Sequence, residues 1–395
     1  MKMTKVHCGY LPLVDCAPLI VAKELKFAAQ EGLDLSLVKQ PSWSALRDML
    51  AFGTLNFAHM LSPMPLAMSL GLSGITSDID VLMVLSVNGT IIGVSEALCR
   101  QMQLTGWTNS FGDPEGSAVA LFATDPKRLR IGVPFPFSMH RMLLETWLSQ
   151  APGFRADRVE IVTVPPPKMA DAVQDGTLDI FCVGEPWGSV AVQNSNATLI
   201  LPGTALWDFS PEKVLGVRRN WAQEHPDLCQ AMIRAIYKAS HWLDQPENIP
   251  LATEILARSQ HLDLPDHAIE PALSGRFVTQ PGQRPKQTER FLKFHKGSAN
   301  YPSHSQAYWI ADVLSHWHQL DPDESRRIAQ ACFRTDIYLQ ALTSIGVEWS
   351  KSIPVSIAVG AEATTQPSPE DAVIPAADRF FSGAIFDFMK SEAPE

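Results

Sequence analysis

The sequence lacks the features that define several protein classes. Its longest apolar runs, such as residues 81–85, are far shorter than the roughly 20 residues that a membrane-spanning helix needs. It contains no Gly-x-Ser-x-Gly elbow, P-loop or dinucleotide fingerprint, so we expect no catalytic activity. Charged residues make up only 19% of the chain and the net charge is −10, which argues against direct nucleic-acid binding.

The six cysteines form no Cys-x-x-Cys pair. We therefore expect small buried thiols in a reducing compartment, with neither disulfides nor a metal site. A secretory leader is also not visible, because Met1–Thr4 leads directly into an alternating, strand-like stretch over residues 5–10. These two patterns predict a cytoplasmic protein.

Strand-like and helix-like segments alternate over the first 220 residues, in two units. The first unit has strands at 5–11, 33–39, 55–59, 81–87 and 91–95, and helices at 17–31, 42–52 and 63–70. The second has strands at 129–133, 159–164 and 178–183, and helices at 138–150, 168–175 and 186–193. Such alternation is typical of parallel sheets with crossover helices.

Two residues at element boundaries carry local signals. Asp15 is a candidate N-cap for the helix at 17–31, and Asn88-Gly89 is a turn signal between two strands. Residues 213–218 form a further strand, which we expect to return to the first unit. From residue 221 the chain reads as mostly helical.

These patterns predict an α/β fold with two lobes. Residues 1–90 form the first part of lobe 1 and residues 91–212 form lobe 2. Residues 213–345 return to lobe 1 and add a helical region, and residues 346–395 form a C-terminal tail packed on the surface.

Four segments together resemble a known family. They are residues 15–22 (DCAPLIVA), 39–48 (KQPSWSALRD), 58–65 (AHMLSPMP) and 181–187 (FCVGEPW). In this order they resemble the nitrate-binding branch of the ABC-transporter solute-binding proteins. That resemblance implies a type II periplasmic-binding-protein fold, in which two α/β lobes are joined by a hinge and the ligand lies between them, here with a helical C-terminal extension.

Because we expect no leader, the chain looks most similar to cytoplasmic nitrate/nitrite sensors of the NasS type. The resemblance then implies that it binds nitrate or nitrite without a cofactor and sequesters an ANTAR-type antitermination regulator (NasT-like), which it releases when the ligand binds. Three alternatives stay open. They are a substrate-binding component of an ABC importer, a binding protein for bicarbonate or a sulfonate, and an enzyme on the same fold.

The resemblance also implies ligand-binding residues. Nitrate is small, planar and singly charged, so its site needs N–H or cationic donors and a flat wall. Trp43 would supply an indole N–H and a wall, although ordinary core packing is the alternative. Ser44 and Ala45 would supply backbone N–H groups at a helix start.

Three further ligand-binding residues lie beyond the first helices. His140 would act at a helix start, and Lys213 would be the fixed positive charge, unless it is only a surface lysine paired with Glu212. Thr90 stands where relatives carry an amide side chain, and its hydroxyl would donate one hydrogen bond. Residues expected to line the cleft without holding the anion are His59, Glu185, Pro186 and Trp187.

Overall fold

The computed structural model describes residues 3–125, 127–194, 197–347 and 380–383. Its larger sheet has six strands. In spatial order they are β13 (Leu292–Lys293), β4 (Ile79–Asn88), β10 (Pro211–Arg218), β3 (Phe57–Leu61), β1 (Thr4–Tyr10) and β2 (Leu33–Lys39). Strands β1, β2 and β3 run parallel, whereas β10 runs antiparallel to both β3 and β4. The expected return strand therefore lies inside the first sheet.

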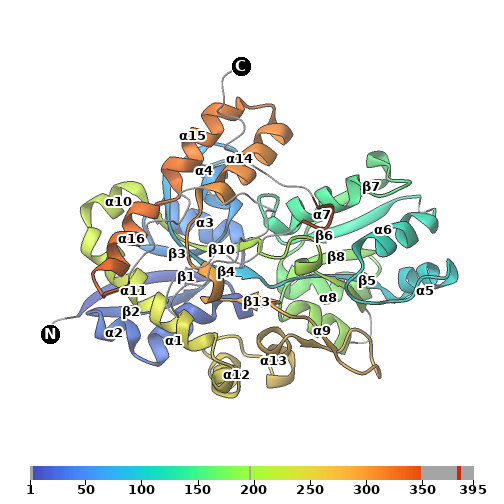
Figure 1. Cartoon of the computed structure of the whole chain (residues 1–395), viewed down its shortest axis with the longest axis horizontal. Helices are drawn as coiled ribbons and strands as arrows, with labels where there is room; N and C mark the ends of the chain where they lie inside the picture. The colour runs from blue at the N-terminus through green and yellow to red at the C-terminus, as the bar shows by residue number, and fades with distance from the viewer. Residues whose placement is uncertain (1–2, 126, 195–196, 348–379, 384–395) are drawn as a thin grey trace.

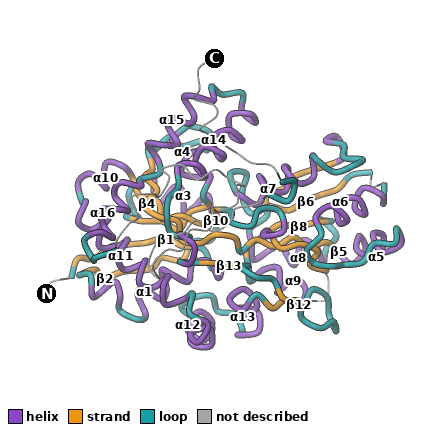
Figure 2. The backbone as a smooth tube through the Cα atoms, in the orientation of Figure 1, coloured by secondary structure: helices purple, strands orange, loops and turns teal. Residues whose placement is uncertain are grey.

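A second sheet of five strands lies beside the first, and Figure 2 shows the two groups of strands. Its spatial order is β7 (Val159–Thr163), β6 (Leu129–Val133), β8 (Ile180–Gly184), β5 (Thr90–Ser95) and β9 (Ala197–Pro202). Strand β6 runs parallel to both neighbours, and β5 runs antiparallel to both of its own. We call the first sheet and its helices lobe 1, and the second sheet and its helices lobe 2.

Helices cover both lobes (Figure 1). Those of lobe 1 are α1 (Ala17–Glu24), α2 (Phe27–Gln30), α3 (Trp43–Ala51), α4 (Pro63–Ser69), α10 (Arg219–Glu224), α11 (Pro226–Leu243), α12 (Ile249–Ala257), α13 (Asp266–Ser274), α14 (His304–His318), α15 (Pro322–Cys332) and α16 (Thr335–Thr343). Those of lobe 2 are α5 (Glu96–Leu104), α6 (Pro114–Ala123), α7 (Met139–Ser149), α8 (Met169–Gln174) and α9 (Trp187–Gln193). The short strands β11 (Arg276–Phe277) and β12 (Lys286–Gln287) pair as a separate hairpin.

The central strands of each sheet are buried on both faces, which explains why β3, β4 and β8 read as nearly continuous apolar runs. Along β4, Val84 packs in one hydrophobic cluster with α3, α4, α14 and α15, whereas its neighbour Leu85 packs in a second cluster with α1 and α11. All ten residues of β4 are buried. The helices after residue 221 thus complete the core of lobe 1.

The chain crosses between the lobes at two central places. The first is Asn88-Gly89, where both residues have positive φ (61° and 91°), as the turn signal predicts. The strands on either side do not form a hairpin, however, because β4 belongs to lobe 1 and β5 to lobe 2. The chain returns between Pro202 and Pro211.

The side chain of Asn88 fastens the two crossings to each other. Its Nδ2 donates to the carbonyls of Asp208 (2.8 Å) and Arg290 (3.0 Å), and its Oδ1 accepts from the Ser210 N–H (3.1 Å). Tertiary hydrogen bonds of a buried side chain therefore override the local preference for a hairpin.

The single helix expected over residues 17–31 is wrong. The structure has two helices, α1 and α2, and the residue before α2, Lys26, has a φ of 62°. Asp15 is not the N-cap of α1, because its carboxylate is committed to Lys213 and His59, as described below.

Other expectations concern the cysteines and the tail. All six cysteines are buried and none is in a disulfide, as predicted. Among the described residues, no helix is long and apolar enough to span a bilayer. Most of the tail predicted at 346–395 lies outside the described residues; Phe380 is buried and stacks on Trp207 in the second crossing segment.

Lobe 2 offers a test of its packing. Gly93 on β5 lies opposite Phe181 on β8, and a Cβ at Gly93 would lie 2.2 Å from the Phe181 ring. We expect Gly93→Ala to lower the free energy of unfolding by about 1–3 kcal/mol, as overpacking does. The control is Gly112→Ala, where a Cβ meets nothing within 4 Å. Equal urea midpoints for the two variants would contradict this packing.

Candidate functional site

Loops at the carboxyl ends of parallel strands from both lobes bring polar side chains together, as expected for α/β sheets. Asp15 follows β1, Trp43 follows β2 and His140 follows β6. The central cluster consists of these three residues with His59 on β3, Thr90 on β5, and Glu212 and Lys213 on β10. No member of the central cluster is more than 2% exposed.

Lys213 is the positive centre of the cluster. Its Nζ lies 2.7 Å from Asp15 Oδ2 and 2.8 Å from Glu212 Oε1. Consecutive residues of a regular strand point to opposite faces, so Glu212 and Lys213 would normally separate. The pairing of β10 with β4 shifts register on both sides of Lys213, and this irregularity accompanies the contact between the two side chains.

The Glu212 carboxylate links the two lobes. It accepts hydrogen bonds from Lys213 Nζ and from Thr90 Oγ1 (3.1 Å), and it lies 3.2 Å from His140 Nδ1. Thr90 and His140 belong to lobe 2, whereas Glu212 and Lys213 belong to lobe 1. Three of the predicted ligand donors therefore meet at one carboxylate.

Asp15 holds the other side of the cluster. Its Oδ1 lies 3.0 Å from His59 Nε2, and the His59 ring lies 5.8 Å from the Trp43 ring between centroids. Lys213 Nζ lies 5.6 Å from the centre of the Trp43 ring, within reach of a cation–π interaction. Trp43 thus forms an aromatic wall beside the ammonium, as expected.

Burial and charge shift the pKa values in this cluster. Burial alone would raise the pKa of Asp15, but Lys213 and His59 together hold that pKa down at about 2. Burial would lower the pKa of Lys213, yet its two carboxylate neighbours raise it. Burial lowers the pKa of His140 to about 4, so this ring is neutral at pH 7. Asp15 and Lys213 accordingly form a charged pair.

Three buried nitrogen atoms of the central cluster have neither a hydrogen bond nor an ion-pair contact within the described part of the chain: Trp43 Nε1, His59 Nδ1 and His140 Nε2. A buried donor or acceptor without a partner costs about 1–3 kcal/mol, so such atoms mark a place where a ligand or water is expected. Gly184 packs closely against these groups, because a Cβ on it would lie 2.7 Å from Leu13 Cδ2, 3.4 Å from Asp15 Oδ2 and 3.8 Å from His140 Nε2.

Comparison with known proteins gives the family. The model of the NMT1-like family matches residues 1–257. The chain belongs to the NMT1-like family. The nitrate/nitrite binding protein NrtA of Nostoc sp. (strain PCC 7120) is 31% identical over 399 residues, covering 99% of this chain and 85% of that protein. The nitrate import ATP-binding protein NrtC of Synechocystis sp. (strain PCC 6803) is 31% identical over 349 residues, covering 88% of this chain but only 51% of NrtC. The chain thus spans about half the length of NrtC.

Solved structures confirm the predicted fold of this NMT1-like protein. The periplasmic nitrate-binding protein NrtA from Synechocystis PCC 6803 superposes with a TM-score of 0.82 at 27% identity, covering 98% of this chain and 96% of that one. The alkanesulfonate-binding protein SsuA from Xanthomonas axonopodis pv. citri, solved with MOPS, gives a TM-score of 0.56 at 16% identity over 86% of this chain and 98% of its own. The second likeness shows the fold alone.

Two predicted ligand residues of this NMT1-like chain do not join the central cluster. Ser44 is exposed, and the Ala45 N–H already donates to the Ser42 hydroxyl, which caps α3 (3.1 Å). The cap fixes the start of the helix and so the position of Trp43, but it consumes the Ala45 donor. The backbone donor expected at Ala45 is therefore not available in this structure.

The predicted cleft wall connects the lobes. Trp187 Nε1 donates to the Pro12 carbonyl (3.0 Å), and the Val14 N–H donates to the Glu185 carbonyl (2.9 Å). Pro186 between them is buried. The Glu185 side chain is buried as well, which raises its pKa to about 7, although its Oε2 accepts from the Ser189 N–H (3.1 Å). These residues hold loop 12–14 of lobe 1 against α9 of lobe 2.

Sequence reasoning missed Asp15 and Glu212 as members of the site. Asp15 begins the DCAPLIVA segment that carries part of the resemblance, and Glu212 directly precedes the predicted lysine. A buried lysine needs carboxylate partners, and that requirement was the available signal. The alternative of a surface Lys213–Glu212 pair is wrong, because the pair exists but both side chains are fully buried.

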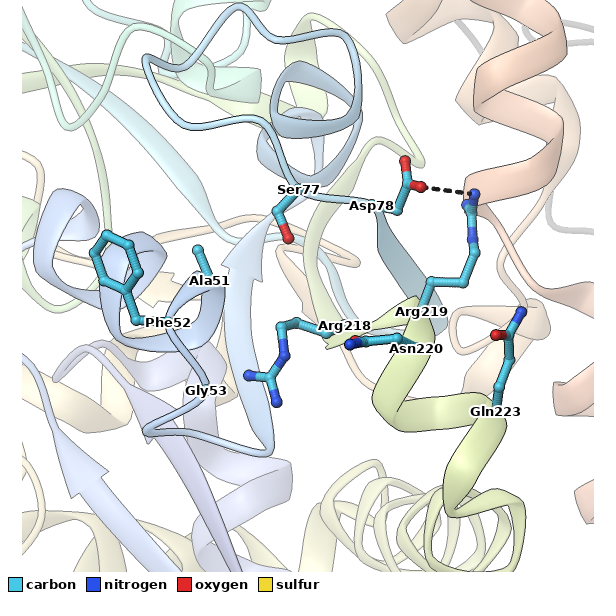
Figure 3. Close-up of a pocket in the computed structure, with 9 residues that line it drawn as sticks. All are labelled: Ala51, Phe52, Gly53, Ser77, Asp78, Arg218, Arg219, Asn220 and Gln223. Carbon is cyan, nitrogen blue, oxygen red and sulfur yellow. Dashed lines mark ion pairs between the residues drawn. The ribbon is translucent and has the colours of Figure 1, made fainter.

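A separate depression in lobe 1 holds none of the predicted site residues (Figure 3). Its two guanidinium groups are already engaged. Arg218 donates to the carbonyls of Leu50 and Leu55, and Arg219 pairs with Asp78 and Asp80. This depression is therefore a weaker candidate than the central cluster.

The buried charges predict a distinctive pH response. Because the folded-state pKa of Asp15 is lowered to about 2, its pairing stabilises the fold above pH 4 and is lost as pH falls toward 2. Lys213→Met removes the cation, so burial raises the pKa of Asp15 instead. The variant should lose about 3–5 kcal/mol at pH 7 and regain part of it as pH falls from 7 to 5.

Urea unfolding at several pH values measures this effect. The matched control is Lys238→Met, which removes a half-buried cation paired with Glu31 and should cost about 1 kcal/mol or less. A Lys213→Met variant as stable as this control would contradict the pairing described for the central cluster.

Proposed function

We propose that this chain is a solute-binding protein for nitrate or nitrite, acting as the substrate-binding component of an ABC-type import system. The observation that carries the proposal is the set of buried, unpartnered nitrogen atoms around Lys213. Trp43 Nε1 and His140 Nε2 have no partner among the described residues, although both side chains are buried. A small planar anion beside the Lys213 ammonium would accept a hydrogen bond from the Trp43 indole and, once the ring takes up a proton, from His140 Nε2, with the Trp43 ring as a flat wall.

The placement of the cluster supports a binding mechanism. Trp43 and Lys213 come from lobe 1, and His140 comes from lobe 2. An anion held by donors from both lobes favours the arrangement in which the lobes are in contact. The Trp187–Pro12 and Val14–Glu185 hydrogen bonds already join the lobes at the same edge. Ligand binding would thus stabilise the arrangement in which the two lobes are closed on each other.

The comparisons favour transport over regulation. The relatives named above are binding and import proteins, which also agrees with the expectation that the chain is not an enzyme. The role of a cytoplasmic sensor that sequesters an ANTAR-type antitermination regulator stays a prediction, as does the location itself. Co-purification of such a regulator that is lost on adding nitrate would favour sensing, and nitrate-dependent docking on a permease would favour import.

A calorimetric anion panel tests the ligand. We expect saturable binding of nitrate or nitrite by the whole chain, and weaker or no binding of bicarbonate and an alkanesulfonate. Tighter binding of bicarbonate or the sulfonate would replace the proposed ligand with another small oxyanion.

Trp43→Phe isolates the contribution of the indole N–H. A hydrogen bond to a charged partner contributes about 1.5–3 kcal/mol, so nitrate affinity should fall about tenfold or more. The control is Trp147→Phe, another buried tryptophan, whose Nε1 donates to the Pro114 carbonyl in lobe 2. The control should lose stability but keep its nitrate affinity, and a reversed result would remove Trp43 from the site.

Proton uptake should accompany binding. In the unliganded protein the pKa of His140 is lowered to about 4, so the ring is neutral at pH 7. Glu212, Lys213 and Asp15 also face this ring, and a bound anion adds a negative charge that raises its pKa. Affinity for nitrate should therefore rise as pH falls from 8 toward 5. Calorimetry in buffers of different ionisation enthalpy would count the proton, and a pH-independent affinity in the wild type would contradict protonation of His140.

A further inference from the structure

Two predicted ligand residues are already hydrogen-bonded to a group of the protein itself, and a third faces the same group. Lys213 Nζ and Thr90 Oγ1 donate to the Glu212 carboxylate at 2.8 and 3.1 Å, and His140 Nδ1 lies 3.2 Å from it. Glu212 is fully buried, so no water from bulk solvent competes for these bonds. A carboxylate is planar, singly charged and accepts hydrogen bonds through oxygen, as nitrate and nitrite do.

We propose that the Glu212 carboxylate is an internal anion, which holds Lys213, His140 and Thr90 until a small planar oxyanion takes them over. This inference rests on the proposed function and deepens it, because it assigns to Glu212 the control of affinity at that site. It also defines the ligand class as planar oxyanions of carboxylate size.

The number of hydrogens on each donor decides which donors Glu212 and a ligand must compete for. The Thr90 hydroxyl has one hydrogen, so it cannot donate to Glu212 and to a ligand at the same time. The Lys213 ammonium has three hydrogens, of which Asp15 and Glu212 take two. A ligand that needs Thr90 must therefore displace Glu212, whereas Lys213 can be shared.

Charge adds to the competition. Lys213 already faces two carboxylates, those of Asp15 and Glu212, within 3 Å. An anion brought into the same buried space meets their repulsion, which is weakly screened away from water. Asp15 also contacts His59, whereas Glu212 contacts the two lobe 2 donors, so Glu212 is the carboxylate whose removal frees the predicted ligand positions.

Calorimetric titration of nitrate into Glu212→Gln tests this. The amide keeps the shape of the side chain and an acceptor oxygen but removes the charge. We expect nitrate to bind about tenfold or more tightly than to the wild type. Unchanged or weaker binding would overturn the proposal and make Glu212 a positioning residue for Lys213. The control is Glu145→Gln, which removes a carboxylate paired with Arg141 on the same helix as His140 and should leave affinity unchanged.

A second measurement does not depend on nitrate. Glu212→Ala removes the internal carboxylate, and acetate should then take its place. We expect 50 mM acetate to raise the melting temperature of Glu212→Ala by several degrees more than that of the wild type, with chloride as the ionic-strength control. No difference would overturn the internal-anion proposal. If the wild type binds neither nitrate nor nitrite while acetate rescues Glu212→Ala, the proposed function fails and the internal anion stands.

Discussion

The burial of the Lys213 ammonium between the lobes is the constraint on which the site depends. A charge removed from water without partners costs many kcal/mol, so Asp15 and Glu212 must accompany it. Two carboxylates around one ammonium leave an excess negative charge, which in turn needs further donors. His59 meets Asp15, and Thr90 and His140 meet Glu212. The buried lysine thus requires the two carboxylates, and the carboxylates in turn require the donors around them.

This arrangement reconciles an acidic environment with an anion ligand. His140 is the adjustable group, because burial lowers its pKa to about 4 and keeps the ring neutral at pH 7 without ligand. A neutral ring becomes a cation by taking up one proton, which offsets the charge of an incoming anion. In the proposed function, Lys213 would fix the position of the anion, and protonation of His140 would adjust the charge of the site.

The sequence predicts the architecture well because its signals are local and repeated. Apolar strands separated by helices indicate both sheets, and the Asn88-Gly89 step indicates positive φ values where they occur. Trp43, His140 and Lys213 were found through motifs and do meet in space. Asp15 and Glu212 were missed, because the pattern indicated an N-cap role for Asp15 and only a surface pairing with Lys213 for Glu212. The requirement for carboxylate partners applies only if Lys213 is buried, which the structure shows and the local sequence pattern does not.

The position of Glu212 connects the site to the lobe crossings. Thr90 is the first residue of lobe 2 after the crossing at Asn88-Gly89, and Lys213 lies near the start of the return strand. Glu212 contacts both, while Asn88 ties the same two crossing segments together from the other side through Asp208 and Ser210. The Asn88 bonds involve backbone groups that no ligand replaces, so they hold the crossings in place. The Glu212 bonds involve side-chain donors that an anion could take, so in the proposed function they would couple binding to the relative position of the lobes.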